Sequence, residues 1–346
     1  MTRTKTATHR IARMETTVLG RNGPVVGALG LGCMGMSPGI YGPADDAESI
    51  ATLHSAVEAG VTLLDTGDFY GMGHNEMLIR RALDVIPRSQ IVISVKFGAL
   101  RDPAGGWGGN DCRPQAVKNF LAYTLRRLGT DYVDIYRPAR VDPTVPIEDT
   151  IGAIADMVRA GYVRHIGLSE VGVETIRRAH VVHPIADLQI EYSLMSRGIE
   201  STILPAVRQL GISVTAYGVL SRGLLSGRVP AASTKGDIRV VRMPRFQQGN
   251  LERNLSLVNE LRLIGNEKGA SPGQLAIAWV RSRGLDIVPL VGARRRDHLK
   301  EALASLDLNL SADDLARIDA AVQPGLTAGA RYDPTQMEHL DSERNS

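Results

Sequence analysis

The chain has 346 residues, a formal net charge of +3 and two cysteines, and 43% of its residues are hydrophobic. This composition supports a buried core, so a disordered chain and a small disulfide-stapled protein are both excluded. The basic residues are scattered among acidic ones, which predicts no nucleic-acid or membrane partner.

The two cysteines, Cys33 and Cys112, lie far apart and outside any CxxC pattern. We therefore expect no metal site and a reducing compartment, the cytoplasm. Residues 1–14 are basic but lack the apolar segment of a secretory signal. We interpret them as a disordered tail, with a transit peptide or a translation start at Met14 as alternatives.

Short apolar runs alternate with stretches of helical periodicity along the chain. Strands are expected at 25–33, 61–65, 90–97, 132–136, 164–169, 186–190, 212–217 and 287–291, and helices at 46–59, 75–85, 114–128, 147–160, 173–181 and 203–209. Several helical stretches end at a glycine, as helices before a following strand commonly do. Eight strands in this rhythm predict a single-domain (β/α)₈ TIM barrel over residues 15–324.

Three segments depart from this rhythm. Residues 218–249, rich in Gly, Ser, Arg and Pro, form a loop long enough to be a lid or a binding loop. Two further helices are expected at 251–268 and 272–283, and Ser271 and Pro272 supply the start of the second. Residues 325–346 form a C-terminal tail with little periodicity, which is either disordered or folded over the barrel mouth.

Chemistry in such barrels lies at the C-terminal ends of the strands. Asp65 ends the second expected strand, Tyr70 follows it, and Lys96 lies at the end of the third. An adjacent ammonium group lowers the pKa of a phenol, and a carboxylate holds the lysine in place. Taken singly, each residue has a plainer explanation: Asp65 as a cap, Tyr70 as rim packing and Lys96 as a surface charge.

These residues carry a resemblance to a known family. The stretch from Gly60 to Gly71 resembles the signature of the aldo-keto reductases, and Ser94 to Lys96 resembles their lysine segment. The similarity continues through 161–169 and 189–193 and spans residues 14–321. On the stretches 140–143 and 218–227, the chain is most similar to the bacterial branch related to the potassium-channel β-subunits.

The resemblance implies NADPH-dependent interconversion of a carbonyl and an alcohol. It assigns Tyr70 as the general acid, Lys96 as the group that lowers its pKa, and Asp65 as the partner of Lys96. Most members carry a histidine after the fourth strand, and here that position is Ala139. Alanine cannot donate a hydrogen bond to the carbonyl, a loss that typically costs a factor of about 10²–10³ in rate.

The sequence after the eighth expected strand indicates a phosphate site. Gly292 and three consecutive arginines, 294–296, precede a helix, and guanidinium groups suit the 2′-phosphate of NADP(H). A solvated arginine cluster is the alternative. The family resemblance implies a larger set of cofactor-binding residues, comprising Cys33, Met34, Asp65, Ser169, Gln189, Tyr217, Gly218, Leu220, Ser221, Gly223, Leu225, Gly292, Arg294, His298 and Glu301.

The substrate pocket is expected to include Met34, Phe97, Trp107 and Ala139, with surface packing as the alternative for Trp107. Two functions follow. The first is a cytoplasmic NADPH-dependent oxidoreductase acting on a small aldehyde or ketone. The second is an NADP(H)-binding regulatory subunit with slow turnover. A homo-oligomer is left open by the sequence.

Overall fold

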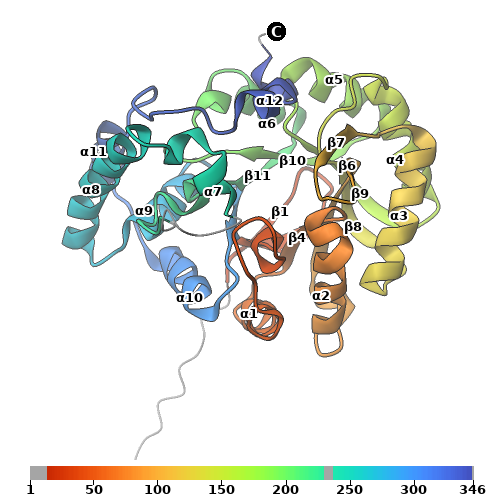
Figure 1. Ribbon diagram of the computed structural model, residues 1–346, viewed down its shortest axis with the longest axis horizontal. Helices are drawn as coiled ribbons and strands as arrows, with labels where there is room; N and C mark the ends of the chain where they lie inside the picture. The colour runs from red at the N-terminus through yellow and green to blue at the C-terminus, as the bar shows by residue number, and fades with distance from the viewer. Residues whose placement is uncertain (1–13, 230–236, 345–346) are drawn as a thin grey trace, which may run out of the picture.

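The computed structural model describes residues 14–229 and 237–344, so the predicted N-terminal tail lies outside the described residues except for Met14. Eight parallel strands form a closed barrel in the order β3, β4, β5, β8, β9, β10, β11, β12 (Figure 1). This confirms the predicted (β/α)₈ barrel. The barrel strands are β3 (Gly30–Gly32), β4 (Leu63–Gly67), β5 (Val92–Phe97), β8 (Val133–Pro138), β9 (Val163–Ser169), β10 (Ile185–Glu191), β11 (Ser213–Tyr217) and β12 (Ile287–Gly292).

Helices cover the outside of the barrel (Figure 1). They are α1 (Asp46–Glu58), α2 (His74–Ala82), α3 (Pro114–Leu128), α4 (Ile147–Arg159), α5 (Val173–Val182), α6 (Ile203–Leu210), α8 (Asn250–Lys268), α9 (Pro272–Ser282), α10 (Arg296–Ala304) and α11 (Ala312–Ala321). The hydroxyl of Ser271 accepts a hydrogen bond from the Gln274 amide at the start of α9, as the sequence predicts. None of the helices that the structure describes is long and apolar enough to span a membrane.

The first expected strand, 25–33, is in fact two strands. Its first half, β2 (Val25–Gly27), pairs antiparallel with β1 (Thr16–Val18), and only the second half, β3, joins the barrel. Leu19 and Val26 of this hairpin pack on inward-facing residues at the N-terminal end of the barrel: Leu63, Val92, Ile135, Val288 and Leu290. The hairpin thus closes the end of the barrel opposite the predicted site.

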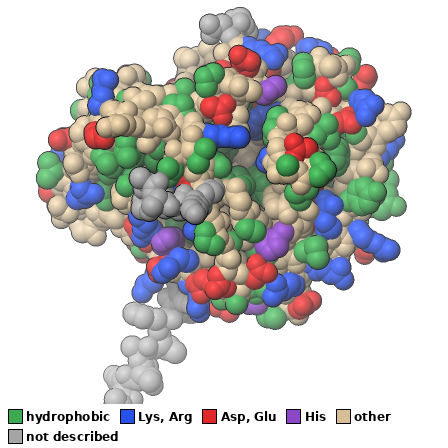
Figure 2. All heavy atoms as spheres, in the orientation of Figure 1, with side chains coloured by type: hydrophobic (Ala, Val, Ile, Leu, Met, Phe, Trp, Pro, Cys, Tyr) green, Lys and Arg blue, Asp and Glu red, His purple; other side chains and the backbone are tan. Residues whose placement is uncertain are grey.

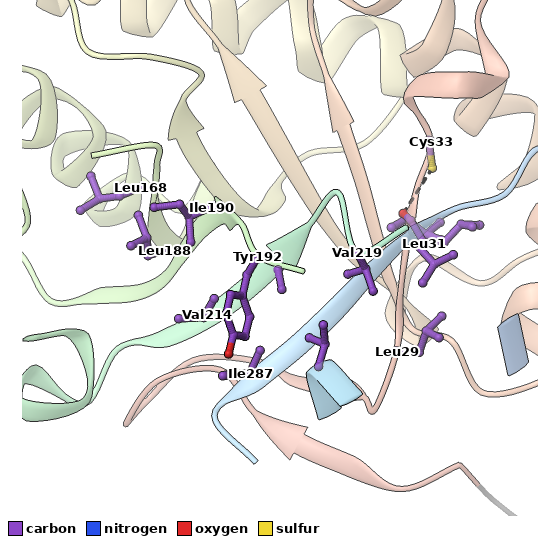
Figure 3. Packing of buried hydrophobic residues seen from close by; sticks show 14 of the residues in the cluster. Leu29, Leu31, Cys33, Leu168, Leu188, Ile190, Tyr192, Val214, Val219 and Ile287 are labelled. Carbon is purple, nitrogen blue, oxygen red and sulfur yellow. Dashed lines mark hydrogen bonds between the residues drawn. The ribbon is translucent and has the colours of Figure 1, made fainter. Parts of the chain in front are cut away.

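Side-chain alternation separates two environments in the barrel. Outward-facing residues such as Leu168, Leu188 and Ile190 are buried in the apolar layer between strands and helices (Figure 3). Inward-facing residues in the middle of the barrel are polar. Arg137 donates to Asp187 at 2.9 Å and to the hydroxyl of Ser94 at 2.8 Å, and both members of the ion pair are fully buried. A rigid polar layer therefore lies directly below the predicted site.

Gly167 makes room for this buried ion pair. A Cβ atom at position 167 would lie 2.8 Å from Oδ1 of Asp187 and 2.9 Å from Cζ of Arg137. Both contacts are shorter than real Cβ atoms make, so the barrel interior requires a glycine here.

The described part of the segment after β11 contains short helices. It contains a 3₁₀ turn at Ser221–Gly223, α7 (Ile238–Val241) and a 3₁₀ turn at Pro244–Phe246, whereas residues 230–236 lie outside the described part of the chain. The amide of Ile238 donates to the carbonyl of Ile40, so this segment reaches the loop before α1. The long loop is therefore tied to another element at the barrel mouth.

The C-terminal tail contains α12 (Pro334–Glu338) and a 3₁₀ turn at Asp341–Glu343. Its Asp341 carboxylate accepts from the Gly172 amide at 2.9 Å, and the Ser342 amide donates to the Glu170 carbonyl at 3.2 Å. Glu170 follows β9 directly, so the tail lies at the C-terminal end of the barrel.

Basic and acidic side chains are interspersed over the face shown in Figure 2.

Candidate active site

Asp65 and Lys96 meet inside the mouth of the barrel. The register pairs Asp65 with Ser94 and Gly67 with Lys96 on the adjacent strands β4 and β5. The ammonium of Lys96 donates to Asp65 and, at 3.0 Å, to Oε1 of Gln189. Gln189 and Ser94 in turn donate to the second oxygen of Asp65 at 2.7 and 2.9 Å. The carboxylate is therefore saturated with donors and holds the lysine in one position.

Tyr70 lies beside this pair in the turn that follows β4. Its ring is 6% exposed, and Nζ of Lys96 lies 5.1 Å from the ring centroid. Phe69 packs edge-on against the ring at a centroid separation of 4.8 Å. Gly71 and Met72 have φ angles of 56° and 54°, and this left-handed backbone begins the turn into α2. The Tyr70 hydroxyl has no hydrogen-bond partner among the described residues.

The electrostatics differ from the prediction in one respect. We expected Lys96 to lower the pKa of Tyr70, but burial and the charge of Asp65 raise that pKa well above its ordinary value. The charge of Arg140 opposes this rise. Burial also lowers the pKa of Lys96, although the contact with Asp65 works in the other direction. Tyr70 is accordingly a protonated phenol, the form required of a general acid.

Two predicted site residues point away from the mouth. Phe97 is fully buried and stacks on Tyr136 at a centroid distance of 4.3 Å, with Phe120 of α3 at 6.3 Å. Because neighbours in a strand face opposite sides, Phe97 points to the helices when Lys96 points inward. The expectation that Phe97 lines the substrate pocket is therefore wrong. The Cys33 thiol likewise lies in the apolar core, bonded to the Leu31 carbonyl (Figure 3), so its side chain is not available to a cofactor.

The other expected pocket residues lie near the mouth. Met34 is half-buried at the start of the 3₁₀ turn Met34–Met36 after β3. Ala139 follows β8, is 2% exposed, and its amide donates to the Phe97 carbonyl at 2.8 Å. Trp107 is 40% exposed on the hairpin of β6 (Ala99–Arg101) and β7 (Trp107–Asn110), where Arg101 lies 5.3 Å from its ring centroid. Its role as a pocket residue stays a prediction.

A second polar cluster lies at the barrel mouth, where the C-terminal tail meets the strand ends. Glu170 is fully buried and accepts from Arg331 at 2.8 and 2.6 Å, from Tyr217 at 2.6 Å and from Ser342 at 2.7 Å. Burial would raise the pKa of Glu170, but Arg331 outweighs it and holds the pKa well below the ordinary range. The hydroxyls of Tyr217 and Tyr332 lie 2.9 Å apart. The tail is thus joined to the strand ends of β9 and β11.

The loop after β11 contains several of the cofactor-binding residues that the family resemblance implies. Its backbone is left-handed at Gly218, Ser221, Arg222 and Gly223. The hydroxyl of Ser221 accepts from Arg245, which also lies 3.4 Å from Glu191. The remaining expected loop residues follow the same turn: Leu220 is partly buried and Leu225 fully buried. Ser169, at the end of β9, lies opposite Gln189 in the strand register.

The predicted site for the 2′-phosphate, which is at the adenosine end of NADP(H), lies at the start of α10. A cavity of about 740 Å³ there is lined by Pro43, Asp45, Glu48, Arg294, Arg295, Arg296 and Asp297. Arg295 pairs with Asp297 and Arg296 with Glu48, both at 2.9 Å. Arg294 donates to the carbonyls of Tyr41 and Pro43.

The two remaining predicted residues of this end lie on α10 itself. Glu301 pairs with Arg228 and accepts from Ser271 at 2.7 Å, while His298 is partly buried. The guanidinium groups at this helix start suit a phosphate group, and the carboxylates of Asp45, Glu48 and Asp297 lie in the same open lining.

Several residues of the mouth were missed by sequence reasoning. Glu170 and Arg331 are far apart in the chain, and no local pattern links them. A usable signal existed only for Glu170 and Glu191, which are acidic residues at the ends of the apolar runs β9 and β10.

Comparisons with known proteins agree with this geometry. The model of the Aldo/keto reductase family matches residues 28–323. The chain is 38% identical over 325 residues to "Probable aldo-keto reductase 1" of Glycine max, covering 93% of this chain and 92% of that protein.

Solved structures are similar over nearly their full length. The glycerol dehydrogenase AKR11B4 from Gluconobacter oxydans superposes with a TM-score of 0.79 at 25% identity, covering 95% of this chain and 97% of that one. An aldo/keto reductase from Klebsiella pneumoniae, solved in complex with NADP and acetate, gives a TM-score of 0.72 at 26% identity, with coverage of 92% and 99%.

Proposed function

This chain belongs to the aldo/keto reductase family of NADP-binding oxidoreductases, and we propose that it is a cytoplasmic enzyme that reduces an aldehyde or ketone to an alcohol with NADPH. The observation that carries the proposal is the buried set of Asp65, Lys96 and Tyr70 at the barrel mouth, with Tyr70 free to donate its proton. The affiliation with the potassium-channel β-subunit branch is part of this proposal and rests on the stretches 140–143 and 218–227 alone.

The cofactor would lie across the mouth, from the cavity at Arg294 to the loop containing Ser221 and on to Gln189 and Tyr217. When bound, NADPH supplies the hydride. Structural relatives include a Klebsiella pneumoniae reductase solved in complex with NADPH, which supports this choice of cofactor. Gln189 already bonds both Asp65 and Lys96, so it connects the nicotinamide end of the proposed cofactor site to the catalytic lysine.

Tyr70 would donate its hydroxyl proton to the carbonyl oxygen of the substrate. Lys96, held by Asp65, places a positive charge beside the ring, and this charge stabilises the phenolate that forms as the proton leaves. Because the site is largely closed to water, this electrostatic effect is stronger than it would be at the surface. The catalytic steps assigned to this chain are therefore proton donation and stabilisation of the resulting anion.

The Tyr70→Phe variant tests this proposal. We expect kcat to fall by about 10²–10⁴ because the proton donor is lost. The fold and the affinity for NADPH should be unchanged, since the hydroxyl bonds none of the described residues. Tyr123→Phe, at an exposed tyrosine of α3, is the matched control. A Tyr70→Phe variant with more than about a tenth of wild-type turnover would remove Tyr70 from the mechanism.

Ala139 favours a second candidate, a nucleotide-binding regulatory subunit with slow turnover, because no imidazole is available there to polarise the carbonyl. Ala139→His tests whether the missing imidazole is simply a lost donor or leaves space for the substrate. If the enzyme only lacks this donor, the variant reduces small aldehydes faster than wild type does. If the space beside Ala139 holds part of a bulky ketone, the variant loses kcat/KM for that ketone. A variant identical to wild type on both would show that position 139 does not face the carbonyl.

A further inference from the structure

Four arginines converge on the barrel mouth, and three of them have a carboxylate partner. Arg331 pairs with Glu170, whereas Arg222 and Arg245 pair with Glu191 at 3.2 and 3.4 Å. Arg140 has no carboxylate within 4.0 Å among the described residues. The one hydrogen bond from its guanidinium to a described residue runs from Nη1 to the Ala139 carbonyl, at 2.6 Å. The remaining N–H groups of this guanidinium are available to a ligand.

The strand register places Arg140 just beyond the end of the strand next to the one that contains Lys96. Lys96 lies opposite Arg137 and Phe97 opposite Pro138 on the neighbouring strands β5 and β8. Arg140 follows two residues later, beyond the C-terminal end of β8. Burial is the main cause of the lowered pKa of Lys96 and the raised pKa of Tyr70, and the charge of Arg140 makes a smaller, lowering contribution to each. Together with the register, this places the guanidinium at the end of the barrel where the carbonyl would bind.

The surroundings of Arg140 form one wall of that space. Its Cζ lies 5.9 Å from the ring centroid of Tyr332, a ring that Arg222 and Arg331 approach at 4.4 and 5.6 Å. On the other side of Arg140 is Ala139, whose methyl group leaves more room than a histidine would. Burial opposes the charge of Arg140, but Tyr217, Tyr332 and Glu170 raise its pKa above the ordinary value, so the guanidinium stays a cation whose unbonded N–H groups can donate to an anion.

We propose that Arg140 binds an oxyanion of the substrate, so that the preferred substrates are carbonyl compounds bearing a carboxylate or a phosphate group. This inference rests on the proposed reductase function. A planar guanidinium fork matches both of these groups and can donate two parallel hydrogen bonds to either. Tyr332 would cover the bound anion from the side of the C-terminal tail.

Two matched substrate pairs test the proposal in NADPH-dependent turnover. The first pair is 4-carboxybenzaldehyde and 4-methylbenzaldehyde, and the second is glyceraldehyde 3-phosphate and glyceraldehyde. In Arg140→Met we expect kcat/KM for the anionic member to fall about 10- to 100-fold, mainly through KM, with a change below about threefold for the neutral member. Comparing each variant with wild type on the same substrate cancels differences in intrinsic carbonyl reactivity.

Two further variants make the result specific. Arg140→Lys keeps the positive charge but loses the planar guanidinium that donates two parallel hydrogen bonds. It should therefore retain part of the preference for the anionic substrate over the neutral one. Arg159→Met removes an exposed arginine at the end of α4 and should change neither member of a pair. If kcat/KM falls for 4-carboxybenzaldehyde, the recognised group is a carboxylate, and if it falls for glyceraldehyde 3-phosphate, the recognised group is a phosphate. Equal losses on both members in Arg140→Met, or no loss on either, would overturn the proposal.

A binding measurement separates this proposal from the proposed function. Benzoate titrated into the NADP⁺-loaded protein should bind wild type at least about tenfold more tightly than it binds Arg140→Met. If no aldehyde or ketone is reduced but this difference is found, the proposed reductase function fails and the anion site stands. If wild type and Arg140→Met bind benzoate equally, or neither binds it, the anion site is wrong. Circular dichroism of both Arg140 variants checks that they are folded.

Discussion

Removing the Arg331 side chain should release the C-terminal tail from the barrel mouth. In Arg331→Met, Glu170 would lose donors at 2.8 and 2.6 Å while remaining fully buried, and the contact of Arg331 with Glu343 would be lost as well. Breaking a buried ion pair by removing one partner costs about 3–5 kcal/mol. Tyr217, Ser342 and the Glu191 amide still donate to Glu170, so we expect the lower end, about 3 kcal/mol.

The barrel can avoid most of this cost if the tail detaches, because water then solvates Glu170. We therefore expect the loss to appear as local opening rather than as global unfolding. A cost of about 3 kcal/mol corresponds to roughly a 100-fold loss of hydrogen-exchange protection in residues 326–344, since 1.4 kcal/mol is a factor of ten. Strand β5 should keep its protection, which serves as the internal control.

Arg331→Lys refines this test because it keeps the charge but loses the two parallel bonds to Glu170. Protection of the tail in this variant should lie between those of wild type and Arg331→Met. Wild-type protection of residues 326–344 in Arg331→Met would refute the argument that the buried ion pair holds the tail.

Three other predictions follow from the same contacts. Gly167→Ala should destabilise the protein by about 1–3 kcal/mol in urea unfolding, because the new Cβ overlaps the buried ion pair, and an unchanged midpoint would contradict this. The pKa of Glu170 in the folded protein lies far below the ordinary value of 4.5, so the ionised carboxylate contributes its full share of stability at neutral pH. That contribution declines as the pH falls below about 4.5. Urea midpoints should therefore fall more steeply between pH 5 and about 3 in wild type than in Arg331→Met. The double variant Arg294→Ala, Arg295→Ala should weaken NADPH binding much more than NADH binding in fluorescence titrations, because only NADPH carries the 2′-phosphate. Equal losses of affinity for both cofactors would show that the arginines are a solvated cluster at the helix start and do not bind the phosphate.

The barrel and the core of the candidate site were predictable because both depend on local periodicity. Alternating strands and helices determine the fold class, and strand ends place Asp65, Tyr70 and Lys96 at one rim whatever the details of packing. The length of an apolar run is less informative. The run 25–33 divides into two strands because half of it pairs with an N-terminal strand that the sequence pattern did not reveal.

Only the tertiary structure decided which way residues at the rim point and what they contact. Phe97 faces the helices because side chains alternate along a strand and its neighbour Lys96 faces inward, where it contacts Asp65. Elements that are distant in sequence meet at the mouth. Their meeting pairs Glu170 with Arg331 and leaves Arg140 without a carboxylate partner among the described residues. Such contacts arise because the barrel closes and the C-terminal tail returns across its mouth. No local pattern in the sequence shows which residues these two events bring together.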